Sequence, residues 1–301
     1  MKRHFCFVAS LLLIAMTISV TEVHASDSTI YKLNEGSTYQ QGCFPPCLCP
    51  VTVQQPVRGT FKLTLTSSDG LFDFYNVSDA SWVTTVDGSD LRITGSGTYQ
   101  VGGEFALQQR LTLDLSINGG APIHFDSGLV AGGGEFPNIN ITISINDIHC
   151  YDTVIVINAS PTQFTPYSLV DGSSYQQGCF PPCLCPISPE LSMVGTFGLI
   201  KLQEGPLFTE YAAVNIVWTL VPADGSVEGL PIVGTGMFRV GGEFASQQQL
   251  SLDLSVNSGP LTHFDSGLVI GGGEFPLIDI EVSVNGFYCF DQVIHLIAEP
   301  D

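Results

Sequence analysis

The chain has 301 residues, with 29 acidic and only 9 basic side chains, and a formal net charge of −20 at pH 7. Because so acidic a surface repels phosphate backbones and anionic membranes, we expect no nucleic-acid partner. The length corresponds to about two domains.

The first 25 residues have the organisation of a secretory signal peptide. Lys2 and Arg3 give a positive start, residues 5–20 are mostly apolar, and Val23-His24-Ala25 is a suitable cleavage site. The apolar run is shorter than the roughly 20 residues that span a bilayer. We therefore expect cleavage after residue 25, no membrane insertion afterwards, and a secreted or periplasmic location. Removal of two basic and one acidic residue leaves a net charge of −21.

The rest of the sequence is an internal duplication. Residues 37–50 match residues 173–186 at 13 of 14 positions, and residues 101–137 match residues 240–276 at 28 of 37. The offset rises from 136 to 139 between these blocks, beside an Asp-Gly pair, which predicts an insertion at a hairpin tip. We predict two homologous domains, residues 26–160 and 161–301 after the signal segment 1–25, joined near the Pro/Ser/Thr-rich stretch 158–166.

Both copies show the two-residue periodicity of strands that bury one face. Apolar and polar residues alternate in segments 61–66, 111–118, 139–146, 250–256 and 278–284. Residues 153–157 are apolar throughout and predict a central strand, and Gly-rich turn signals separate the runs. We predict an all-β chain of two tandem antiparallel β-sandwich or small β-barrel domains, with about seven to eight strands each.

Eight cysteines follow the signal segment, four in each copy: Cys43, Cys47, Cys49 and Cys150, then Cys179, Cys183, Cys185 and Cys289. An even number in an exported chain predicts disulfides. A bond between Cys47 and Cys49 would close a ring across one residue, which disulfide geometry disfavours. This leaves a local bridge from Cys43 to either Cys47 or Cys49, and a long bridge to Cys150 that closes about a hundred residues.

Metal and redox chemistry fit the cysteines less well than disulfides do. A redox centre uses C-x-x-C beside the start of a helix, whereas each copy has C-x₃-C-x-C among predicted strands. Zinc sites favour paired C-x₂-C motifs and a reducing compartment. We therefore predict structural disulfides, with no metal and no cofactor.

The remaining candidates for binding are acidic residues and histidines that the two copies share. Each HFDSG motif places a His and an Asp on one side of a strand, and the GGEF turns add carboxylates. Such groups bind metals or transfer protons where they converge. The candidate binding residues are Glu104, His124, Asp126 and Glu135 in the first copy, and Glu243, His263, Asp265 and Glu274 in the second. Their default interpretation is solvated strand and turn residues, and no catalytic residue is assigned.

Two further motifs favour structural roles. The GGEF tetrapeptide resembles a nucleotide-cyclase signature, but it lacks the paired acidic residues and the α/β context, so we interpret it as a turn with a bulge. Trp82 and Trp218 occupy equivalent positions in apolar strands, which favours core packing over sugar stacking.

The sequence therefore favours an exported, non-catalytic protein with a binding or structural role outside the cell or in its envelope, and a carbohydrate or cell-surface protein as partner. Two alternatives stay open. One is a secreted enzyme that acts on polysaccharide through paired carboxylates. The other is a β-barrel that carries a small apolar ligand. The oligomeric state does not follow from the sequence.

Overall fold

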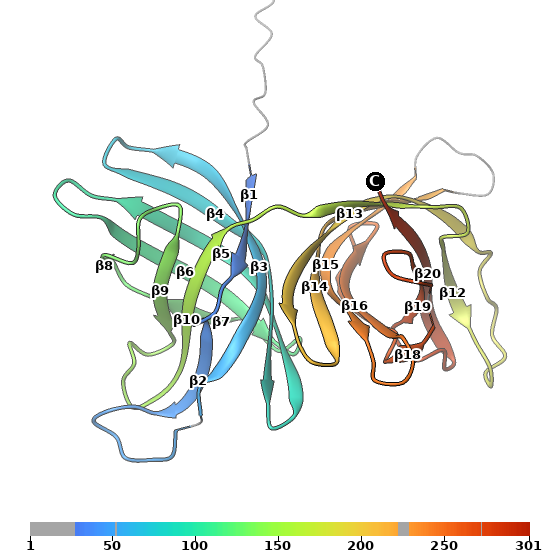
Figure 1. The fold of residues 1–301 in the computed structure, drawn as a ribbon, viewed down its shortest axis with the longest axis horizontal. Coiled ribbons are helices and arrows are strands. Elements are labelled where there is room, and N and C mark those ends of the chain that lie inside the picture. Colours follow the sequence, from blue (N-terminus) through green and yellow to red (C-terminus); the bar gives the residue numbers. More distant parts are fainter. Residues whose placement is uncertain (1–27, 52, 222–228, 272) are drawn as a thin grey trace, which may run out of the picture.

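The computed structural model describes residues 28–51, 53–221, 229–271 and 273–301, so the expected signal segment lies outside the described residues. All regular structure in this part is β, in two similar halves that lie side by side (Figure 1). The first half contains β1 (Ser28–Leu33), β2 (Thr38–Cys43), β3 (Gln55–Ser68), β4 (Phe72–Val86), β5 (Ser89–Gly102), β6 (Gln108–Ile117), β7 (Ile123–Asp126), β8 (Val130–Ala131), β9 (Ile139–Ser144) and β10 (Tyr151–Pro161). The second contains β11 (Thr165–Leu169), β12 (Ser174–Cys179), β13 (Leu191–Glu204), β14 (Phe208–Val221), β15 (Leu230–Gly241), β16 (Gln247–Val256), β17 (Leu261–Asp265), β18 (Val269–Ile270), β19 (Ile278–Ser283) and β20 (Phe290–Pro300).

Each half is one antiparallel sheet of ten strands that closes on itself. In the first half the pairing runs from β3 through β4, β5, β6, β7, β9 and β10 to β1, and β1 pairs with β3 again. The second half repeats this connectivity from β11 to β20. The short β2 and β8 and their counterparts β12 and β18 pair beside this ring. This confirms the prediction of tandem antiparallel β domains, and the closed ring corresponds to the small barrel.

The interior of each ring is filled by side chains. On β6, Leu111, Leu113 and Leu115 are buried, whereas Thr112 and Asp114 between them face outward, as the alternation predicted. The largest buried side chains of the first half are aromatic: Tyr31, Phe61, Trp82, Tyr99 and Phe125. The second half has an equivalent core around Trp218, Phe238 and Phe264. A packed core of this kind gives no support to the carrier alternative in the part of the chain that the structure describes.

The predicted hairpin insertion falls between β14 and β15. The corresponding turn of the first half is Asp87-Gly88, and both residues have positive φ, 50° and 79°, as such tight turns require. In the second half β14 ends at Val221 and β15 begins at Leu230, and the tip itself, residues 222–228, lies outside the described residues.

The join between the halves is shorter than the stretch 158–166 that composition indicated. Asn158 and Ala159 pair with β9, and β10 continues to Pro161, so only residues 162–164 separate β10 from β11. The backbone hydrogen bonds of the ladder outweigh the weak strand propensity of this stretch.

Each cysteine loop is held by two disulfides. Cys43 bonds Cys49 within the loop, and Cys47 bonds Cys150, which immediately precedes β10, with Cα–Cα distances of 5.1 and 4.8 Å. Of the two local pairings left open by the sequence, the structure shows the one with Cys49.

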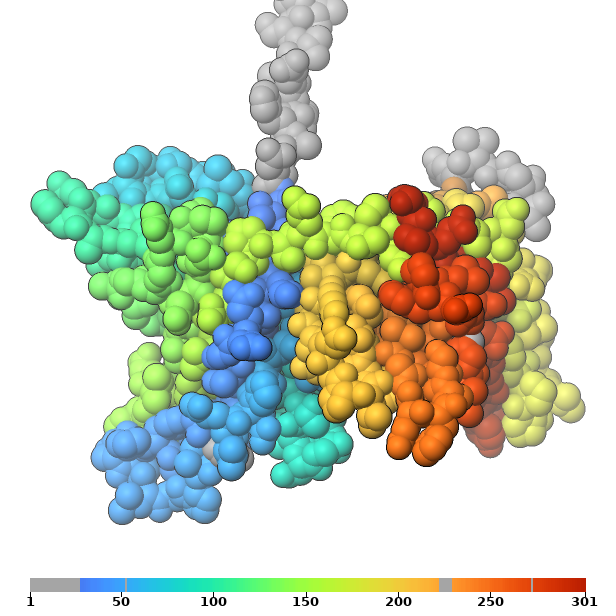
Figure 2. Space-filling model, in the orientation of Figure 1, coloured from blue at the N-terminus to red at the C-terminus, as the bar shows by residue number. Residues whose placement is uncertain are grey.

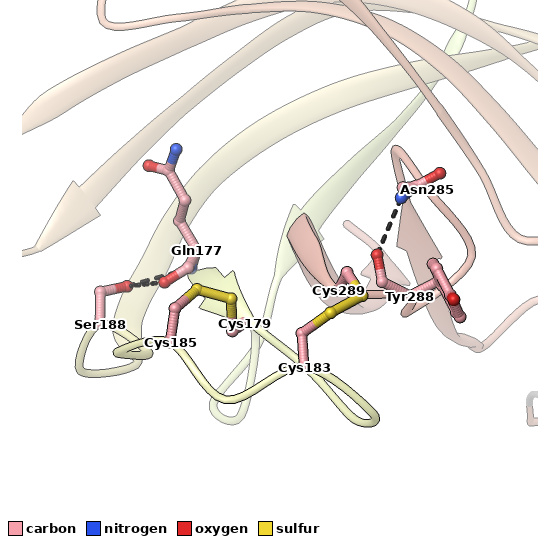
Figure 3. The surroundings of a disulfide bond; sticks show 8 residues. All are labelled: Gln177, Cys179, Cys183, Cys185, Ser188, Asn285, Tyr288 and Cys289. Carbon is pink, nitrogen blue, oxygen red and sulfur yellow. Dashed lines mark hydrogen bonds between the residues drawn. A yellow bond between two sulfur atoms is a disulfide. The ribbon is translucent and has the colours of Figure 1, made fainter.

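The second half has the same arrangement (Figure 3). Cys179 bonds Cys185, and Cys183 bonds Cys289, which precedes β20. Ser188 and Gln177 also exchange hydrogen bonds, 2.6 Å from the Ser188 hydroxyl to the Gln177 carbonyl, across the base of the loop. The long bridge thus ties the segment after an early strand of each half to its last strand.

The two halves meet along β1 and β3–β5 of the first and β13–β17 of the second. Ile30 of β1 packs in one hydrophobic cluster with Ile200, Ala212 and Val214 of the second half. Figure 2 shows this contact as the blue β1 lying against the yellow β14. Beside this cluster the surfaces separate into a cleft.

Candidate functional site

A cleft of ≈ 220 Å³ lies between the two halves. Its first-half wall comes from β3, β4 and β5 and its second-half wall from β14 to β17. The charged and titratable side chains that line it are Arg58, Asp90, Arg92, Glu210, Arg239, Asp253, His263 and Asp265. The described chain contains four arginines, and three of them line this one cleft.

Arg58 on β3 connects the halves at one end of the cleft. Its guanidinium forms a two-pronged ion pair with Glu210 on β14, with Nη2 3.3 Å from Oε1. Asp90 of the same half lies 3.9 Å from Nη2. The side chains of Arg58 and Glu210 are only 16% and 13% exposed, so water screens this pair less than a surface pair.

Arg92 on β5 makes the second charged connection. Its Nη1 donates to Oδ1 of Asp253 on β16 at 2.5 Å and lies 2.6 Å from Nδ1 of His263 on β17. Nδ1 of His263 is 3.0 Å from the same Asp253 oxygen, so the three side chains form one cluster. Burial opposes the charged Asp253 carboxylate, but the His263 hydrogen bond and the Arg92 charge outweigh burial and lower the pKa of Asp253.

Arg239 on β15 is the third arginine of the cleft, and it differs from the other two. Its guanidinium lies 5.4 Å from the centre of the Phe208 ring, at the distance of a cation–π contact. Glu210 is the cross-strand neighbour of Arg239, but the Glu210 carboxylate bonds Arg58. Within the described residues the buried Nε of Arg239 has no hydrogen-bond partner. Among the described residues Arg239 is therefore a cleft guanidinium without an ion-pair partner.

The equivalent face of the first half is open to solvent. His124 Nδ1 lies 2.8 Å from Asp114 Oδ1, with both side chains more than 60% exposed. Arg110 donates to both carboxylate oxygens of Asp126, at 3.1 and 2.5 Å. The Arg110 hydrogen bond is the largest of the effects that lower the pKa of Asp126. His124 and Asp126 thus point to one side, as predicted, but each is paired with a neighbour on β6.

The glutamates of the GGEF turns lie apart from these clusters. Glu104 and Glu135 are exposed on two loops that a hydrogen bond from Gly132 N to Leu107 O joins. Glu243 and Glu274 occupy the same positions in the second half. Among the described residues no hydrogen bond or ion pair joins these four carboxylates to His124 or His263, and no group of three metal-ligating side chains occurs.

The glycines of these turns have a structural role. Gly133 has a φ of 93°, and a Cβ built there would lie 1.3 Å from Nε2 of the buried Gln109. That nitrogen donates to the carbonyls of Gly132 and Asn140, which fixes the loop on the sheet. In the second half, Gln248 Nε2 also donates to a glycine carbonyl of the corresponding turn, that of Gly273. The GGEF repeat therefore corresponds to a packed turn.

Trp82 and Trp218 are 1% exposed and belong to the two cores. Their rings pack edge-on against Phe61 and Phe197. This burial confirms core packing and rules out a role as exposed stacking platforms for sugars.

The sequence identified His263 and Asp265 but missed Arg58, Arg92, Glu210 and Arg239. A signal for the missed residues was present in the differences between the copies. Arg58 and Arg92 correspond to Val194 and Pro231, so the basic residues that reach across the cleft occur in one copy only.

Searches against protein-family models, curated proteins and solved structures find no significant match for this chain. Within the described residues, no helix has the length and apolarity to cross a bilayer.

Proposed function

We propose that this is an exported, non-catalytic protein in which two disulfide-held β modules act as one extracellular or envelope-associated binding or structural unit. The observation that carries the proposal is the pairing of all eight cysteines in the described chain as four disulfides within their own halves. Such disulfides persist in oxidising compartments, and the sequence begins with a predicted export signal.

The use of the histidine clusters supports a non-catalytic role. His263, Asp253 and Arg92 pair with one another across the two halves, and His124 pairs with Asp114. These side chains hold the modules together or lie on an open sheet face. The charged residues of the cleft therefore support fixed relative placement of the modules.

Expression with and without residues 1–25 tests the export part of the proposal. The full chain should reach the periplasm or the medium with no free thiol by mass spectrometry, and the truncated chain should stay in the cytoplasm with reduced cysteines. Full-length protein recovered in the cytoplasm with reactive thiols would refute it.

The cleft suggests carbohydrate as the ligand class. Arg239 lines the cleft without an ion-pair partner among the described residues, and a guanidinium donates well to a sugar hydroxyl or carboxylate oxygen. The strongly negative chain repels polyanions, so a neutral or weakly acidic glycan fits better than a highly sulfated one.

A glycan array with the mature protein tests this ligand class, with and without added Ca²⁺ and with chelator. Arg239→Ala should abolish any signal at the cleft, and the matched control Arg110→Ala, on the exposed face of the first half, should keep it. Release of reducing ends from a polysaccharide would instead favour the enzyme alternative. Binding that survives Arg239→Ala would place the ligand elsewhere.

A further inference from the structure

The outer face of β13–β15 carries Glu210 and Arg239 where it lines the cleft and mostly apolar side chains elsewhere, and the first half covers only one group of these apolar side chains. In the covered group, Ile200 on β13 and Ala212 and Val214 on β14 pack with Ile30, and the partly buried Met237 on β15 joins them. These residues alternate with core residues such as Leu199 and Ala213, so they point outward.

Beyond the part that the first half covers, the same face presents three exposed valines. Val194, Val217 and Val233, here called the valine face, are 51%, 57% and 47% exposed. Val217 lies directly opposite Val233 in the β14–β15 ladder, and Thr196, two residues from Val194, lies opposite Val217. They point outward because their neighbours Met193, Trp218 and Ile232 are in the core. Val217 and Val233 are thus a cross-strand pair, and Val194 is the diagonal neighbour of Val217, so the three side chains lie on one surface.

The equivalent face of the first half is covered by the other module. The residues equivalent to Val194, Val217 and Val233 are Arg58, Ser81 and Thr94. All three line the cleft, where the second half covers them. In one copy, therefore, this face is polar and lies against another module of the same fold. In the other copy it is apolar and open.

From this contrast we infer that the valine face is a self-association surface, on which a second copy of the chain packs its own valine face about a two-fold axis. Copies of so acidic a chain repel each other except through an uncharged face, and the valine face carries no charged side chain. An isologous contact places the same patch on both sides, which suits a patch without charged side chains.

A second open sheet face of the described chain makes a poor partner for the valine face. It is the β6–β7 face of the first half, with Arg110, Asp114, His124 and Asp126. Docking these charges on valines would remove their water without providing new partners, which opposes the contact. Head-to-tail chains of this protein are therefore disfavoured relative to a closed dimer.

Sedimentation velocity of the mature, disulfide-bonded chain over a concentration series tests the inference. The wild-type protein should show a monomer–dimer equilibrium. The double variant Val217→Glu/Val233→Glu places four carboxylates in a dry contact and should raise the dimer dissociation constant about 100-fold or more. Val217→Ile/Val233→Ile should keep the dimer.

Ile270→Glu is the matched control, since Ile270 on β18 is 76% exposed and lies outside the valine face. It should leave the dissociation constant unchanged. If the glutamate variant does not fold, as judged by its denaturation midpoint, Val217→Thr/Val233→Thr keeps the shape and should still weaken the dimer about tenfold. A monomeric wild-type protein at all concentrations, or a dimer that the valine-face variants leave unchanged, overturns the inference.

Discussion

Arg92 and Arg110 form ion pairs of similar length in different surroundings. Arg92 pairs with Asp253 across the cleft, with side chains 28% and 13% exposed, whereas Arg110 pairs with Asp126 on an open face, with side chains 48% and 25% exposed. Exposed pairs contribute little because water and salt screen them, whereas loss of one partner of a half-buried pair leaves an unpaired charge.

Arg92→Ala should therefore lower the free energy of unfolding by roughly 1–3 kcal/mol, because Asp253 loses its guanidinium partner. Arg110→Ala should cost less than about 1 kcal/mol. Denaturant titration of both variants and the wild type measures the difference. Equal losses of unfolding free energy in the two variants would show that the ion pair in the cleft contributes no more than the exposed pair.

The lowered pKa of Asp253 predicts a pH dependence. A carboxylate whose pKa is lower in the folded chain stabilises the fold above the unfolded value of about 4, and this contribution disappears as the pH falls through the folded value. The stability of the wild type should thus fall more steeply below about pH 4 than that of Asp253→Asn. Parallel curves of unfolding free energy against pH for the two proteins would contradict the assignment.

At the scale of single residues, side-chain alternation predicts which residues of β6 are buried. Leu111, Leu113 and Leu115 are buried as expected. The partners of His263 were not predictable, because Arg92 lies 171 residues away in the sequence and meets it only when the two halves pack. One sequence contains no information on such pairing unless the copies are compared residue by residue.

At the scale of elements, a disulfide of the cysteine loop links the segments beside β2 and β10, two strands that are also hydrogen-bonded neighbours in the sheet. Cys43 on β2 lies opposite Tyr151 on β10, and the bridge from Cys47 to Cys150 closes the same contact covalently. The sequence separation is 103 residues for this bridge and 6 for the bridge from Cys43 to Cys49. Chain entropy makes the longer loop more stabilising.

Removal of the long bridge by Cys47→Ser/Cys150→Ser should cost up to about 4.7 kcal/mol, and removal of the short one by Cys43→Ser/Cys49→Ser about 2.4 kcal/mol. The difference of about 2 kcal/mol reflects the larger gain in unfolded-state entropy. Urea titration measures it, and peptide mapping under non-reducing conditions confirms the remaining bridge. A larger loss of unfolding free energy on removal of the short bridge than of the long one would contradict this prediction.

Alternation predicts only part of the long strands β3, β4, β13 and β14, such as residues 61–66 of β3. Register shifts interrupt their ladders, for example between Thr60 and Lys62 and between Ala213 and Ile216. Each shift lets one residue bulge out and breaks the strict alternation from which strands are recognised. The closure of the sheet into a ring is not predictable from alternation either. Alternation indicates that β1 has a buried face, but not that it pairs with both β3 and β10.

At the scale of the whole molecule, the two halves share one fold because the sequence is duplicated. The charged residues that connect the halves lie at positions where the two copies differ. The core and the cysteine loop are nearly identical in the two halves, whereas Arg58 and Arg92 exist in only one. Together with Glu210 and Asp253 they connect the halves beside the Ile30 cluster. We therefore expect the two modules to unfold as one cooperative unit.

Differential scanning calorimetry of the mature protein tests this expectation most directly. Cooperative modules should give a ratio of calorimetric to van't Hoff enthalpy of about 1, and the double variant Arg58→Ala/Arg92→Ala should raise the ratio toward about 2 as the halves uncouple. A wild-type ratio of about 2, unchanged in the variant, would mean that the modules unfold independently and that the arginines do not connect them.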